Sequence, residues 1–92
     1  MISGAQIRAA RGLLDITAAE LARRADISYR TLQRFESVDG LPDAQARNLD
    51  RLRATLEGLG IVFVGDPLSS PGVQLQRASP RKGRSNRNRG RA

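Results

Sequence analysis

Apolar residues near the start of the chain recur at helical spacing. Ile7, Ala10 and Leu14 fall at positions i, i+3 and i+7, and therefore on one face of a helix. Ser3 and Gln6 fit a capping box, in which each side chain bonds a backbone N–H that the first turn leaves free. The pattern predicts a helix that begins after Ser3 and packs one face on a core.

A second helix is expected after Thr17, which forms another capping-box pattern with Glu20. Its apolar positions follow the spacing i, i+3, i+4 and i+7 and are mostly small, namely Ala18, Leu21, Ala22 and Ala25. A face of such small residues lets a neighbouring helix approach closely.

A third helix follows after a very short turn. Only Asp26 and Ile27 separate the second helix from the next cap, Ser28. Asp is one of the residues that tolerate the left-handed conformation that so tight a turn often needs. Leu32 and Phe35 then give the third helix its inward face. Because the turn is so short, the second and third helices must cross steeply rather than lie side by side.

A fourth helix is predicted after a loop that contains Asp39, Gly40 and Pro42. It starts at Asn48 or about a turn earlier and stops near Gly58 or Gly60, where glycine suits a helix C-cap. Four leucines lie on one stripe of this helix: Leu49, Leu52, Leu56 and Leu59.

The segments IVFV and VQLQ predict a β-hairpin at residues 61–76. They are separated by the turn-rich stretch GDPLSSPG. A lone two-stranded ribbon is marginal in water, so this hairpin must pack on the helices or on a second subunit.

The net charge of +7 comes entirely from the C-terminal end of the chain. Residues 1–76 carry nine arginines and nine acidic residues, whereas residues 77–92 carry six arginines, one lysine and no acid. This tail has no Ile, Leu, Val, Phe or Tyr, so we expect it to be disordered. The chain therefore divides into a helical unit (1–60), the hairpin (61–76) and an arginine-rich tail (77–92).

The composition argues against several classes of protein. The chain has no cysteine and no histidine, which removes disulfides, the commonest general base and the commonest metal ligands. We find no catalytic constellation, and we expect no enzyme, no metal, no cofactor and no small-molecule ligand. No apolar stretch approaches the roughly 20 residues that a membrane helix needs. The N-terminus has no secretory signal pattern, so we expect a cytoplasmic protein.

The outward positions of the third helix carry side chains that can read DNA bases. Arginine can form two hydrogen bonds with guanine, and glutamine can do the same with adenine. The candidate base-reading residues are Tyr29, Arg30, Gln33 and Arg34.

The segment LLDITAAELARRADISYRTLQRFES resembles the helix-turn-helix of the phage-repressor-like (XRE) transcriptional regulators. The resemblance covers roughly residues 4–60. It implies a mainly α, four-helix, lambda-repressor-like domain, here followed by the hairpin and the tail. It also implies that residues 28–37 form the recognition helix in the major groove of double-stranded DNA, in a bacterial cytoplasm. Thr17, Ser28 and Thr31 would then face phosphates.

Arg11 lies within the apolar face of the first helix and needs a partner, because a lone buried charge is costly. Glu36 poses the same problem at the end of the third helix. The family pairs an arginine and a glutamate at matching positions, so we predict a structural ion pair between Arg11 and Glu36. Two positions depart from the family: Ala18 replaces a phosphate-binding glutamine, and Asp26 replaces the usual glycine of the turn.

The tail and the hairpin suggest two further interactions. Arginines among Gly, Ser and Asn bind phosphates without reading sequence, so we expect non-specific DNA contacts from Arg81, Lys82, Arg84, Arg87, Arg89 and Arg91. The exposed edge of the hairpin favours pairing with a second copy, hence a homodimer.

Two other functions stay open. The chain could be an antitoxin-like or other protein-interaction module that binds DNA secondarily. It could also be an RNA-binding protein that uses its basic tail.

Overall fold

Four helices and one antiparallel hairpin form in the order that the hydrophobic pattern predicts. The structure is a computed structural model, and it describes residues 1–42 and 46–77. Within these residues the elements are α1 (Gly4–Leu14), α2 (Ala18–Ala25), α3 (Tyr29–Glu36), α4 (Ala46–Gly58), β1 (Ile61–Val64) and β2 (Gly72–Leu75). The predicted tail lies outside the described residues, apart from Arg77.

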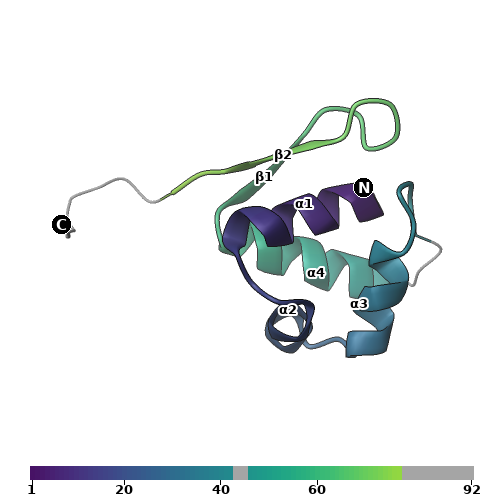
Figure 1. The fold of residues 1–92 in the computed structure, drawn as a ribbon, viewed down its shortest axis with the longest axis vertical. Coiled ribbons are helices and arrows are strands. Elements are labelled where there is room, and N and C mark those ends of the chain that lie inside the picture. Colours follow the sequence, from purple (N-terminus) through teal and green to yellow (C-terminus); the bar gives the residue numbers. More distant parts are fainter. Residues whose placement is uncertain (43–45, 78–92) are drawn as a thin grey trace, which may run out of the picture.

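The elements form three layers (Figure 1). The hairpin covers one side of α1 and α4, and α2 and α3 pack on the other side. The core between them consists of side chains from every helix and from β1: Ile2, Ile7, Ala10, Leu21, Ala22, Ala25, Leu32, Phe35, Leu52, Leu56 and Ile61. The hairpin and α3 therefore lie on opposite sides of the layer that α1 and α4 form.

The helix starts follow the predicted caps, with one difference. Ser3 and Gln6 form the full capping box, with reciprocal bonds of 3.0 and 3.2 Å. Thr17 accepts a bond of 3.1 Å from the Glu20 N–H. The second capping box was therefore predicted only half correctly, because the Glu20 carboxylate pairs with two arginines of its own helix instead of turning back.

Two aspartates end helices in the left-handed conformation. Asp26 closes α2 with φ of 58°, as its place in the short turn predicts, and Asp15 closes α1 with φ of 56°. Each aspartate N–H donates to carbonyls of the helix that it ends. The Asp15 N–H donates to those of Arg11 and Gly12, and the Asp26 N–H donates to those of Ala22 and Arg23. Both connections to α2 are short for this reason.

The hairpin packs on the helices, which is one of the two arrangements that the sequence allows. Ile61 pairs with Leu75, and Val64 pairs with Gly72. The second strand begins at Gly72, one residue before the predicted VQLQ segment. The buried Gln6 side chain of α1 fixes the far end of the ribbon, because its Nε2 donates to the carbonyls of Gly72 at 3.0 Å and Val64 at 3.3 Å.

In the part of the chain that the structure describes, none of the helices combines the length and apolarity that crossing a bilayer requires.

Candidate nucleic-acid interface

The outer face of α3 consists of Tyr29, Arg30, Gln33 and Arg34, all of which are exposed. Ser28 caps the helix by accepting a bond of 3.0 Å from the Thr31 N–H. Leu32 and Phe35 are fully buried on the opposite side. A helix of only two turns is thus held by one apolar edge and presents four polar or aromatic side chains to solvent.

The side chains of the outer face of α3 have no ion-pair or hydrogen-bond partner among the described residues. Tyr29 is 49% exposed, so about half of its surface lies against the protein and the other half faces solvent. Its phenol and the guanidinium and amide groups beside it keep all their hydrogen-bonding capacity for another molecule.

The hydroxyl groups expected to contact phosphates differ in how they are engaged. Ser28 donates its hydroxyl proton to Thr31 Oγ1 at 2.8 Å while its oxygen caps α3. Thr31 therefore keeps its own O–H as a donor, and Ser28 uses its proton internally. Thr17 uses only its oxygen as a cap and likewise keeps an O–H to donate.

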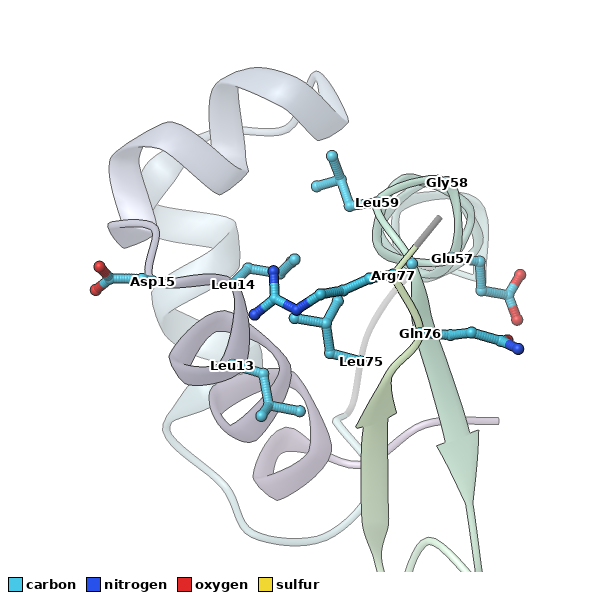
Figure 2. A pocket seen from close by; sticks show the side chains of 10 residues that line it. Leu13, Leu14, Asp15, Glu57, Gly58, Leu59, Leu75, Gln76 and Arg77 are labelled. Atoms are coloured by element: carbon cyan, nitrogen blue, oxygen red, sulfur yellow. The ribbon is translucent and has the colours of Figure 1, made fainter. Parts of the chain in front are cut away.

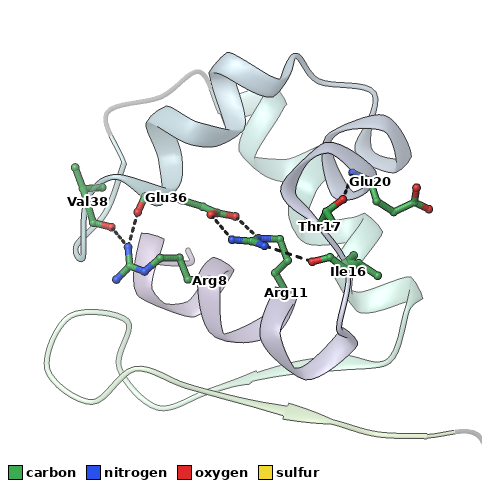
Figure 3. A network of polar contacts seen from close by, with 7 residues as sticks. All are labelled: Arg8, Arg11, Ile16, Thr17, Glu20, Glu36 and Val38. Atoms are coloured by element: carbon green, nitrogen blue, oxygen red, sulfur yellow. Dashed lines mark hydrogen bonds and ion pairs between the residues drawn. The ribbon is translucent and has the colours of Figure 1, made fainter.

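An ion pair between Arg11 and Glu36 joins α3 to α1, as expected from the sequence (Figure 3). It has two parallel bonds of 3.0 Å, from Nε to Oε2 and from Nη2 to Oε1. The Glu36 side chain is 11% exposed, and the Arg11 side chain is 29% exposed. Hydrogen bonding to Glu36 raises the pKa of the Arg11 guanidinium above its ordinary value. Arg11 also donates to the Ile16 carbonyl at 3.4 Å, and so reaches the connection to α2.

Arg8 supports the end of α3 from the next turn of α1, a role that the sequence analysis missed. It donates to the Glu36 carbonyl and, at 3.2 Å, to the Val38 carbonyl (Figure 3). It also pairs with Asp39. Carbonyls at a helix C-terminus have no partner within the helix, so a cation there satisfies them. The available signal was the i, i+3 spacing of Arg8 and Arg11.

Gly4 completes this contact because α1 touches the backbone after α3. A β-carbon at Gly4 would lie 1.8 Å from the Val38 carbonyl oxygen and 2.5 Å from that of Phe35. The Gly4 N–H also donates to the Gly40 carbonyl at 2.9 Å. We call the set Gly4, Arg8, Arg11 and Glu36 the α1–α3 junction.

Three further arginines make contacts around α2. Glu20 binds Arg23 and Arg24, each at 2.7 Å, and these bonds lower the pKa of Glu20. Arg51 of α4 donates to the Asp26 carbonyl at 3.3 Å, which ties the turn between α2 and α3 to the core. The Arg51 contact was not predicted, since nothing in the spacing of Arg51 marks a partner in a distant turn.

The predicted tail contacts lie outside the described residues: Arg81, Lys82, Arg84, Arg87, Arg89 and Arg91. Residues 1–42 and 46–77 contain no group of three Cys, His, Asp or Glu side chains that could hold a metal ion.

No protein-family model matches the chain, and neither the curated proteins nor the solved structures include a match.

Proposed function

We propose that the protein is a sequence-specific regulator of transcription that binds double-stranded DNA with α3 in the major groove. The observation that carries this proposal is the outer face of α3. Its four side chains have the chemistry for base contacts, are exposed and have no partner among the described residues. In this proposal α2 and α3 form a helix-turn-helix of the phage-repressor-like type.

The α1–α3 junction supports the proposal because base reading needs a fixed helix. A bidentate contact to a base depends on the position of the guanidinium or amide within fractions of an ångström. The Arg11–Glu36 pair and the Arg8 contacts hold the C-terminal end of α3, while the Ser28 cap orders its N-terminal end. The outer face of α3 therefore rests on a rigid base.

The tail would supply affinity that does not depend on sequence. The helical and hairpin regions carry as many acidic as basic residues, whereas residues 77–92 carry seven cations. Each neutralised phosphate adds about −0.9 to the slope of log affinity against log salt concentration on duplex DNA. Removal of the tail should weaken binding to all sequences alike and flatten this slope, and a loss of discrimination between sites would contradict the division of roles.

We further propose that two copies bind together, joined through the hairpin. The hairpin is a two-stranded sheet, so each strand has one edge without a strand partner in the described part of the chain. A symmetric dimer whose two α3 helices lie about 34 Å apart would match one turn of DNA.

Selection of binding sites from random duplex DNA at fixed salt tests this function. We expect a short motif in two copies, separated by about one helical turn. RNA of matched length serves as competitor. A pool that stays random, or RNA that competes as well as the selected duplex, would contradict the proposal.

A further inference from the structure

A leucine-lined groove lies at the end of the molecule where α1 and α4 both terminate (Figure 2). Its volume is about 740 Å³. Leu13 and Leu14 come from the end of α1, Leu59 follows α4, and Leu75 ends β2. We call this site, formed by these four leucines, the leucine groove.

Two carboxylates and one guanidinium, that of Arg77, flank the leucine groove. Asp15 follows α1 and Glu57 lies in the last turn of α4, and Figure 2 shows their carboxylates on opposite sides of the leucines. The C-terminus of a helix adds partial negative charge, and the last turn of α4 contains no basic residue to offset it. Glu57 forms an ion pair with Arg53 at 3.1 Å, while Asp15 has no ion-pair partner among the described residues.

The chain leaves this groove directly into its most basic segment. Arg77 lines the groove, and Figure 2 shows its side chain extending past Leu75 towards Leu14. Residues 78–92 follow with five arginines, one lysine and no acid. Fifteen residues span up to roughly 50 Å when extended, so they are long enough to turn back onto the rim.

We propose that the leucine groove binds the chain's own arginine-rich tail, residues 78–92. Arginine suits both parts of the groove, because its methylene stem covers apolar surface while its guanidinium binds a carboxylate. The methylene stem of Arg77 already covers apolar surface in this way, since it lies over the leucines. The tail needs no apolar residue of its own to occupy such a site.

Tail binding in the groove would compete with DNA binding by the same cations. This consequence rests on the proposed function, whereas occupancy of the groove does not. Exposed ion pairs are weak and are screened by salt over about 8 Å at physiological ionic strength, so the tail would be held loosely and released on contact with phosphates.

Paramagnetic NMR of the full chain tests groove occupancy without DNA. The chain has no cysteine, so Ser85→Cys accepts a single spin label in the tail. We expect the label to broaden the amide signals of Leu13, Leu59 and Leu75 strongly and those of the outer face of α3 weakly. Because position 85 is only eight residues after Arg77, the tether alone gives part of this broadening. Salt at about 1 M, which shortens the screening length to about 3 Å, should reduce the broadening to the level that the tether alone gives.

Variants of the rim complete the test. Asp15→Asn with Glu57→Gln should reduce the selective broadening to the level of the tether alone, and asparagine keeps the left-handed conformation at position 15. Asp50→Asn, which removes an exposed carboxylate of α4 away from the groove, should leave the broadening as strong as in the unaltered chain. Uniform broadening, or selective broadening that is equally strong in the rim variant, would overturn the proposal. Broadening that passes between labelled and unlabelled copies in a mixture would assign the groove to a partner's tail and would overturn binding within one chain.

Duplex DNA affinity separates the groove from the proposed function. With the native tail, the rim variant should bind about two- to fivefold more tightly than the unaltered chain. With the six cations of residues 78–92 changed to glutamine, the rim variant should gain no more per charge removed than Asp50→Asn does. An equal gain with both tails would show a general charge effect and overturn the competition. Selective broadening in a chain that binds no duplex would uphold groove binding while the proposed function fails.

Discussion

The arginines of the α1–α3 junction and the arginines on the outer face of α3 differ in what they contact. At the α1–α3 junction, Arg8 and Arg11 are held by a carboxylate and by carbonyl groups of the same chain. On the outer face of α3, Arg30 and Arg34 are exposed and have no such partner in the described residues. Arginine therefore joins two helices at the α1–α3 junction, whereas on the outer face of α3 its guanidinium is exposed and available to a ligand.

This comparison separates stability from recognition. Changes at the α1–α3 junction should alter the free energy of unfolding and affect DNA only through the folded fraction. Changes on the outer face of α3 should alter DNA binding and leave unfolding unchanged, because surface substitutions usually shift stability by less than about 0.5 kcal/mol.

The largest effect should come from Gly4→Ala. A β-carbon would meet the Val38 carbonyl oxygen at 1.8 Å, so α1 would have to move away from the end of α3. We expect a loss of at least about 3 kcal/mol in the free energy of unfolding. Gly12→Ala is the matched control, because it meets no atom within 4 Å and should stabilise the same helix by about 0.5–1 kcal/mol. Urea unfolding of the two variants measures both, and equal stabilities would refute the tight α1–α3 contact.

Arg11→Ala should have the next largest effect on stability. It leaves the Glu36 carboxylate, which is 11% exposed, without its bidentate partner. We expect a cost of about 2–3 kcal/mol, somewhat below the range for fully buried pairs because Arg11 itself retains contact with water. Arg24→Ala removes an exposed partner of Glu20 and should cost less than about 1 kcal/mol. If Arg11→Ala melts at the unaltered temperature, the ion pair does not hold the junction.

Gln33→Ala should have a smaller effect, and only on recognition. A glutamine that bonds an adenine contributes about 1–3 kcal/mol of discrimination between bases. We therefore expect the preference for the selected site over a site with one altered base pair to fall about tenfold, a value near the lower part of that range. Competition binding with the two duplexes measures this ratio, and thermal unfolding checks that stability is unchanged. A preference that falls equally at every base pair would mean that Gln33 contributes no direct base contact.

The sequence predicts the fold well where side chains act on their own segment. The Ser3–Gln6 capping box and the left-handed Asp26 are local features, and both are present in the structure. The hairpin follows from β-branched residues around a turn-rich loop, and its first strand has the predicted bounds. The Thr17–Glu20 box fails in its second half because Arg23 and Arg24 compete for the same carboxylate.

A contact between residues distant along the chain could be predicted only where a charge on an apolar face needed a partner. Arg11 needs one, and the resemblance to the phage-repressor-like regulators pointed to Glu36. Arg8 and Arg51 lie at exposed or half-exposed positions, where a charge needs no explanation, so their bonds to the ends of other helices were not predicted. Only the i, i+3 spacing of Arg8 and Arg11 gave a signal, and Arg51 gave none. The outer face of α3 was predicted to be exposed, and it is exposed. The fold does not determine which molecule this face binds.

The most direct test of the account is the site preference of the double variant Arg30→Glu with Arg34→Glu. Both the variant and the unaltered chain should be measured on the selected duplex and on a scrambled duplex at one salt concentration, with urea unfolding in parallel. We predict a variant that is as stable as the unaltered chain and binds the two duplexes equally. A variant that is folded and keeps the original preference would show that the outer face of α3 does not read DNA.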